Sequence, residues 1–398
     1  MKEFSFLFIA AAALGVSGKE TADFLREKAL KGDSYAMVAL GDEFFRGEKR
    51  PRNHALALYW YRKAAEKNLP LGLYRYGVCL EFGWGTEKNP RLAFEKYCAA
   101  GKYAAAQLRA AEMLLQGVPG TETLPAVAKD PLKGVLIMRT LCKANYYPAL
   151  MKLAGILYNI PRWRKAHGRE IYNLVLRASN ADPVPPEVQV FQAKLLQEGV
   201  GVERDEVFAR ALLELAANKG NREAEFLFAR CLENGQGCPV NEKKAFEYYS
   251  KSAQKHFPAA LLRMGDYYLA GSFVPQDPGE GVKLFKQAVG QNHPPALRKM
   301  GWCCENGIGV PKDAKQAFHF YERSAQLKDP EGNYQTGRCF LEGIGVQADP
   351  AGAVYFFRRG ALLGNRSAML ALAECLRTGR GCSPDPAAAE AWLKQAAD

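Results

Sequence analysis

Apolar and polar residues alternate along this chain with the spacing of paired amphipathic helices. Bulky residues such as Phe246, Tyr249, Phe318 and Tyr321 lie three, four or seven positions from other apolar residues, which places them on one helix face. Small residues recur in the same segments every 36 residues, or a multiple of 36, at Ala209, Ala245, Ala317, Ala353 and Ala389. Small residues facing large ones allow two antiparallel helices to pack closely, so the pattern predicts repeated helix pairs.

A Gly-x-Gly tripeptide marks the end of the first helix of each pair. It recurs in steps of 36 residues or a multiple of 36, at Gly199 and Gly201, Gly235 and Gly237, Gly307 and Gly309, Gly343 and Gly345, and Gly379 and Gly381. At 271–273 the sequence reads Gly-Ser-Phe and keeps the first glycine. Glycine suits the left-handed residue that ends many helices. Because the tripeptide follows a helix and not a strand, we interpret it as a structural turn and not as a phosphate-binding loop.

Two further columns of residues predict where the helices begin. The second helix of each pair, here called helix B, starts after a capping Asp or Asn, because these side chains accept hydrogen bonds from the first turn. This column contains Asp205, Asn241, Asp277, Asp313, Asp349 and Asp385. Proline is tolerated at the first helical position, and Pro186, Pro258, Pro294 and Pro330 mark the start of the first helix, helix A.

These periods predict an all-α fold, an α-α superhelix (solenoid) of about ten helix-pair repeats of roughly 36 residues. We divide the chain into a signal peptide (1–18), a capping helix (19–31), two repeats (32–102), two irregular repeats with altered loops (103–184) and six regular repeats (185–398). The irregular part has a longer loop at 118–129 and the sequence Ile160-Pro-Arg-Trp-Arg-Lys in place of Gly-x-Gly. An uncovered last helix B would permit end-to-end self-association.

The first residues resemble an export signal, with Lys2 ahead of an apolar run at 4–16 and small residues up to Gly18. We therefore expect export to a bacterial periplasm or the extracellular space. The alternative is an apolar helix that caps the array of a cytoplasmic protein. No later stretch of the sequence is long and apolar enough for a membrane span.

The positive charge is concentrated in the first half of the chain. The net charge of +12 arises from 29 Lys and Arg against 19 Asp and Glu in residues 1–198, and 25 against 23 in the remainder. The densest part, here called the basic segment, contains Arg162, Trp163, Arg164, Lys165 and Arg169. It could attract an acidic or polyanionic partner, or it could be a solvated loop. Aromatic residues do not alternate regularly with the basic ones, which argues against nucleic acid.

The sequence contains no recognisable catalytic motif. Phosphate-binding loops, serine-hydrolase elbows and zinc-protease helices are absent, and the five histidines are scattered. We expect neither a metal site nor a cofactor, and we predict that the protein is not an enzyme.

The ten cysteines fall partly into columns. Cys231 and Cys375 lie near the end of helix A, and Cys238 and Cys382 lie just after the turn. In an exported protein, Cys231–Cys238 and Cys375–Cys382 could form disulfides that tie the turn to its helix. Sister repeats have valine at the second column, so buried free thiols are the alternative.

The segment Gly307-Ile-Gly-Val-Pro-Lys-Asp-Ala-Lys-Gln-Ala-Phe-His-Phe-Tyr-Glu-Arg-Ser-Ala325 resembles the Sel-one-like repeat, a relative of the tetratricopeptide repeat. The resemblance covers residues 32–398 and is loosest between 103 and 184. It implies an adaptor or scaffold with a right-handed superhelix that holds a partner on its concave face. Some exported, cysteine-rich bacterial members have been linked with β-lactam binding or hydrolysis, and a cell-wall role of this kind is the alternative.

In related helical repeats, helix A lines the concave side. Arg230, Arg263, Lys299, Trp302 and Arg338 form what we call the helix-A stripe, at positions three or four apart that vary between repeats. Trp and Arg dominate binding hot spots. We therefore expect this stripe to line a groove for a protein or peptide partner.

Overall fold

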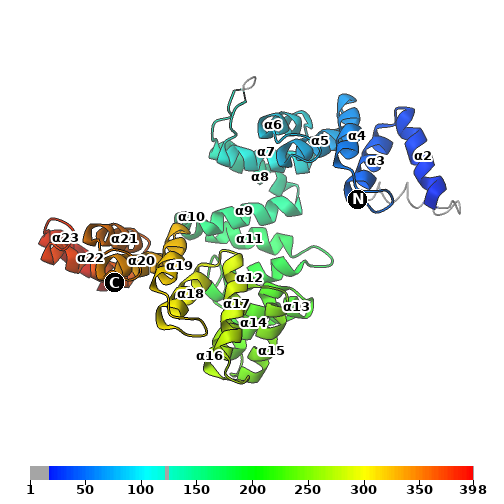
Figure 1. Cartoon of the computed structure of the whole chain (residues 1–398). Helices are drawn as coiled ribbons and strands as arrows, with labels where there is room; N and C mark the ends of the chain where they lie inside the picture. Colours follow the sequence, from blue (N-terminus) through cyan, green and yellow to red (C-terminus); the bar gives the residue numbers. More distant parts are fainter. Residues whose placement is uncertain (1–17, 122–124, 398) are drawn as a thin grey trace. The chain divides into compact units, whose positions relative to one another are not determined.

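The computed structural model describes residues 18–121 and 125–397, and helices account for most of them (Figure 1). The described residues form two compact units, divided between Ala181 and Asp182. Among the described residues, strand-like pairing is confined to a β-bridge between Val118 and Val127 in the long loop. The predicted all-α fold built from helix pairs is confirmed.

The first unit begins with the predicted capping helix and continues as helix pairs. Its helices are α2 (Gly18–Leu30), α3 (Ser34–Arg46), α4 (His54–Glu66), α5 (Pro70–Phe82), α6 (Pro90–Ala99), α7 (Ala104–Gln116), α8 (Pro131–Lys143), α9 (Tyr147–Asn159), α10 (Pro161–Ala166) and α11 (Gly168–Ala178). One expectation is wrong here, because the sequence after Ile160 is not a loop. Pro161 fits the first position of a helix, and the short helix α10 starts there.

The second unit contains six helix pairs of nearly equal length. They are α12 (Pro186–Glu198) with α13 (Glu206–Asn218), α14 (Arg222–Asn234) with α15 (Glu242–Gln254), α16 (Pro258–Ala270) with α17 (Pro278–Gly290), α18 (Pro294–Asn306) with α19 (Ala314–Gln326), α20 (Pro330–Glu342) with α21 (Pro350–Leu362), and α22 (Arg366–Thr378) with α23 (Pro386–Ala397). The even-numbered members are A helices and the odd-numbered members are B helices. The predicted proline starts and Asp or Asn caps are confirmed.

In five pairs of the described residues, the two helices interlock through a glycine on helix A. A Cβ added to Gly265 would overlap the ring of Phe285, and one added to Gly301 would overlap the ring of Tyr321. The same relation joins Gly41 to Tyr61, Gly77 to Tyr97 and Gly337 to Phe357. A glycine inside a helix costs up to about 1 kcal/mol relative to alanine. Here it allows an aromatic ring to lie directly on the partner helix.

The Gly-x-Gly turns join each repeat to the one before it. All ten predicted turn glycines have positive φ. The first glycine is the helix cap, as at Gly235, and the second lies against an earlier helix. A Cβ on Gly237 would overlap the carbonyl of Glu206, the first residue of the preceding helix B. Gly309 and Gly345 stand in the same relation to Pro278 and Ala314.

Two further expectations concern the predicted signal peptide and membrane-spanning segments. The predicted signal peptide at 1–18 lies almost wholly outside the described residues, so export stays a prediction. Within the described ranges, none of the helices has the length and apolar character required to cross a membrane.

The turn geometry predicts that an added methyl group destabilises the fold at Gly237 but not at Gly290. Gly237→Ala places a Cβ against a backbone carbonyl at a residue with φ of 69°, so we expect a loss of at least about 2 kcal/mol in the free energy of unfolding. Gly290→Ala is the control, because Gly290 lies in α17 with no atom near the added methyl. We expect that variant to be neutral or more stable by up to about 1 kcal/mol. Equal stability of the two variants in urea titrations would contradict the role assigned to Gly237.

Candidate functional site

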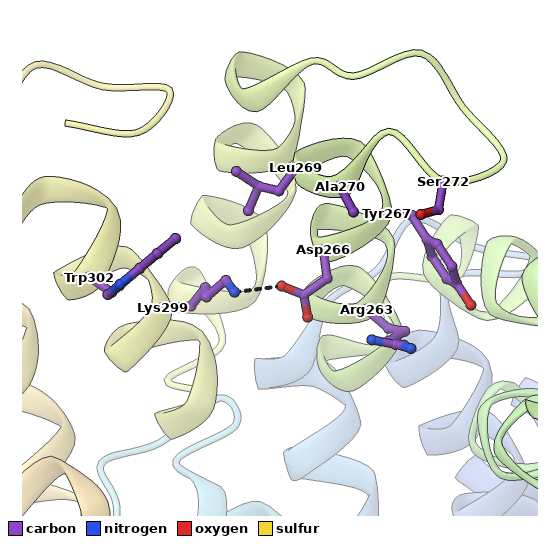
Figure 2. Close-up of a pocket in the computed structure, with 8 residues that line it drawn as sticks. All are labelled: Arg263, Asp266, Tyr267, Leu269, Ala270, Ser272, Lys299 and Trp302. Carbon is purple, nitrogen blue, oxygen red and sulfur yellow. Dashed lines mark ion pairs between the residues drawn. The ribbon is translucent and has the colours of Figure 1, made fainter. Parts of the chain in front are cut away.

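Three residues of the predicted helix-A stripe line one pocket in the second unit. The pocket has a volume of about 390 Å³ and lies between α16 and α18 (Figure 2). Its lining consists of Arg263, Asp266, Tyr267, Leu269, Ala270, Ser272, Lys299 and Trp302. Trp302 is 41% exposed. The pocket therefore combines an apolar part, formed by Trp302, Leu269 and Ala270, with a polar rim.

The charges on the rim of the pocket are balanced within the chain. Lys299 Nζ lies 2.8 Å from Asp266 Oδ1 and 4.9 Å from the centre of the Trp302 ring. Arg263 pairs with Glu233 on α14 and lies 5.0 Å from the centre of the Tyr267 ring. A ligand for this pocket would therefore meet an apolar surface with a neutralised rim, and not a strong positive field.

The repeat that forms most of the pocket differs from its neighbours at two positions. Tyr267 stands where sister repeats have cysteine, as at Cys231 and Cys303. Phe273 occupies the position of the second turn glycine and still has a φ of 64°. Its ring packs 5.6 Å from that of Phe246 and 5.8 Å from that of Tyr267. A bulky residue with positive φ is a rare and strained arrangement, and such residues concentrate at functional sites.

The other two residues of the stripe lie outside the pocket. Arg338 on α20 is 2.6 Å from Glu305 and 3.6 Å from Glu342. Arg230 on α14 has no ion-pair partner among the described residues. The structure therefore places the five side chains on successive A helices but brings only Arg263, Lys299 and Trp302 together.

The ion pairs of Arg263 and Arg338 belong to a contact that links successive repeats. A tyrosine on helix B donates a hydrogen bond to an acid on helix A of its own repeat, and an arginine from the next helix A binds the same acid. The tyrosine-to-acid distances are 2.6 Å for Tyr61 and Asp42, 2.7 Å for Tyr97 and Glu81, 2.8 Å for Tyr249 and Glu233, and 2.9 Å for Tyr321 and Glu305. The arginines are Arg75, Arg109, Arg263 and Arg338. We call each set a Tyr–acid–Arg triad.

Sequence reasoning missed these triads, although the chain contains a signal for them. In three triads the acid lies 16 residues before the tyrosine, as in Glu305 and Tyr321. Where the aromatic residue is Phe285 or Phe357, the position 16 residues earlier is Leu269 or Leu341. In these five repeats the hydroxyl and the carboxylate are thus present together or replaced together. A search for paired changes between repeats would have found this.

Two of the triads, those of Glu233 and Glu305, lower the pKa of their acid. Burial alone would raise the pKa of Glu233, but hydrogen bonds from Arg263 and Tyr249 outweigh it. The same balance lowers the pKa of Glu305, through Arg338 and Tyr321. Both acids are therefore ionised at neutral pH and hold their arginine and tyrosine partners in place.

The basic segment lies on α10 and the first turn of α11, in the first unit. Arg162, Lys165 and Arg169 are exposed, and Trp163 is half-buried. Arg164 turns back onto its own helix pair, with its guanidinium 4.2 Å from the centre of the Tyr158 ring. The predicted cluster is thus real as a surface feature, except that Arg164 serves packing.

All ten cysteines lie among the described residues and are free thiols in the structure. Cys238 Sγ is 3.8 Å from the carbonyl oxygen of Cys231, and Cys382 Sγ is 3.5 Å from that of Cys375. The turn therefore brings each predicted pair into the same neighbourhood. The two disulfides stay a prediction. In the described part of the chain, no group of three or more His, Cys, Asp or Glu could hold a metal ion.

The triads predict that paired replacement is milder than single replacement. Tyr321→Phe or Glu305→Leu alone leaves a polar partner without its bond, at a cost of about 1–3 kcal/mol. Tyr321→Phe with Glu305→Leu reproduces the combination of Phe285 and Leu269. In urea titrations, the free energy of unfolding should fall in the double variant by less than the sum of the two single-variant losses. We expect the difference to be at least about 1 kcal/mol. Additive losses would show that the two side chains act separately.

The lowered acid pKa values predict a pH dependence of stability. A carboxyl whose pKa is lower in the folded state stabilises the fold above its unfolded pKa and loses that contribution as pH falls through its folded pKa. We expect the midpoint of thermal unfolding to fall between about pH 5 and about pH 3. The variant Glu233→Gln with Glu305→Gln should be less stable at pH 7 and should show a flatter pH profile. Glu390→Gln, at an exposed position on α23, is the control and should keep the wild-type profile.

The comparisons with known proteins agree with this architecture. A family model described as "Sel1 repeat" matches residues 34–69, 70–95, 189–221, 222–257, 258–293, 294–329, 330–365 and 366–398, more than half of the chain. The interval from 96 to 188 contains the two repeats with altered loops and the basic segment.

The chain is similar to two yeast regulators over part of their length. Chitin synthase regulatory factor 2 of Schizosaccharomyces pombe is 26% identical over 292 residues, covering 67% of this chain and 49% of that protein. Chitin synthase regulator SKT5 of Saccharomyces cerevisiae is 24% identical over 294 residues, covering 62% of this chain and 41% of that protein. The chain thus spans half or less of these curated relatives.

Two solved bacterial structures share the fold. The protective antigen c5321 of uropathogenic Escherichia coli superposes with a TM-score of 0.54 at 21% identity, covering 96% of this chain and 80% of that one. A Sel1 repeat protein from Oxalobacter formigenes has a TM-score of 0.50 at 24% identity, covering 66% and 96%. With the repeat geometry and the family matches together, the chain belongs to the Sel1 repeat family.

Proposed function

We propose that this protein is a non-catalytic scaffold that binds a partner protein on the face formed by its A helices. The observation that carries the proposal is the pocket of Trp302, because an exposed indole beside a neutralised rim is an arrangement suited to an apolar anchor. Tryptophan is enriched among the residues that contribute most to protein interfaces. Sel1 repeat proteins are generally interaction scaffolds, which supports the same conclusion.

The pocket suits one side chain of a partner segment better than a continuous charged ligand. A volume of about 390 Å³ lies at the lower end of the range for small ligand sites and accommodates a large apolar side chain. Lys299 and Asp266 on the rim can also hydrogen-bond the backbone of a bound segment while remaining close to one another.

A more specific proposal is that the scaffold regulates the protein that it binds. The two yeast relatives are named as regulators of chitin synthase, which supports a protein that acts by binding another protein. The partner of this chain is proposed here only by its chemistry, as a segment with an apolar anchor residue.

Replacement of Trp302 tests the scaffold proposal. The immobilised full chain is used to capture partners from its native cells. We expect Trp302→Ala to lose these partners, because replacing a hot-spot residue weakens the affinity at least about 30-fold. Tyr355→Ala is the matched control, because Tyr355 is an exposed aromatic residue (57%) on the B helix α21. Capture of the same partners at the same yield by Trp302→Ala would refute the pocket's role.

A separate assay tests the absence of catalysis. The purified chain should hydrolyse a chromogenic β-lactam no faster than buffer does. Turnover that survives further purification would favour the alternative of a cell-wall enzyme.

A further inference from the structure

The junction between α9 and α11 differs from the turns elsewhere in the array. Most A helices end at a left-handed glycine, as α14 does at Gly235. By contrast, α9 ends at Ile160 in extended backbone (φ −99°, ψ 110°), and α10 begins at the next residue, Pro161. The chain therefore presents a short extra helix at this position, and that helix carries most of the basic segment.

Three cations of this segment have no ion-pair partner. Arg162, Lys165 and Arg169 are exposed, and among the described residues none of them takes part in an ion pair. Arg162 and Lys165 are three residues apart and share one face of α10. Arg169 lies in the first turn of α11, where the helix dipole disfavours a positive charge. An acidic ligand would relieve this unfavourable accumulation of charge.

Glu170, the acid that follows Arg169 in the sequence, is already engaged. Glu170 accepts two hydrogen bonds from Arg139, at 3.0 and 2.9 Å, and lies 3.0 Å from His167 Nδ1. Its charge is balanced by Arg139 and does not compensate the three exposed cations. This is the opposite of the pocket at Trp302, where each rim cation has an acid of its own.

We propose that Arg162, Lys165 and Arg169 form a second docking surface, which binds an acidic segment of a partner protein. A protein segment fits better than nucleic acid, because binding of single strands relies on exposed aromatic faces. Here the ring of Tyr158 is covered by Arg164 and Trp163 is half-buried. The surface lies in the first unit and does not depend on the proposed pocket in the second.

A labelled peptide of ten glutamates provides the direct test, with binding to the full chain followed by fluorescence anisotropy. The triple variant Arg162→Ala, Lys165→Ala and Arg169→Ala should bind the peptide about tenfold more weakly, as expected for three exposed ion pairs. The control is Lys243→Ala, Lys244→Ala and Lys315→Ala, which removes the same charge from exposed positions on α15 and α19. The control should change the affinity less than about twofold.

Further variants make the outcomes distinct. The variant Arg162→Lys with Arg169→Lys should bind the peptide with nearly wild-type affinity, because all three charges are retained. Trp302→Ala should bind the peptide normally, so failure of the pocket proposal and failure of this one are separable. Wild-type affinity in the triple variant, or an equal loss in the control, would overturn the proposal. The proposal would also be overturned if the wild-type chain bound a ten-nucleotide DNA strand more tightly than the glutamate peptide and the triple variant lost that DNA binding. That result would favour nucleic acid as the ligand.

Discussion

The architecture of this protein depends on the contact between a bare glycine on helix A and an aromatic ring on helix B. The contact lets two helices approach closely enough for the ring to be buried, as for Tyr321 against Gly301. It also fixes where the far end of the ring lies. In three of these repeats, those of Tyr61, Tyr97 and Tyr321, that end is a hydroxyl beside an acid, and the acid in turn binds an arginine of the next repeat. Packing within one repeat thereby sets the polar contact between two.

The pocket arises where this scheme is altered. At Phe285 the hydroxyl is missing, and the position of the acid is occupied by Leu269, which lines the pocket. Lys299 of the following repeat binds Asp266 instead, three residues earlier on α16. The replacement of one polar contact by an apolar residue thus leaves an apolar surface beside Trp302. The basic surface on α10 has a different origin, since it results from an added helix and not from a substitution within the repeat.

The sequence predicted the fold well because its main determinants are local. Glycines with positive φ, capping Asp and Asn residues and N-terminal prolines act within a few residues of their own position, so their period located the helix ends. The candidate site was predicted only in part. Arg263 and Arg338 were expected to be available to a partner, but their acids lie 30 and 33 residues away on a neighbouring helix. Only the three-dimensional structure shows that such residues meet. The helix α10 was missed because the segment after Ile160 replaces a Gly-x-Gly turn, so a loop was considered there.

The second turn glycine also governs how this array can change in length. Gly309 lies against the first residue of the helix B one repeat earlier, and Gly345 does the same. Insertion or loss of one complete period gives every remaining turn an equivalent surface, whereas any other length leaves a turn facing the wrong part of a helix. The pocket is less tolerant, because Leu269 and Trp302 belong to adjacent repeats. Duplication could therefore lengthen the array freely during evolution, but a new repeat inserted between these two would separate the two halves of the binding site.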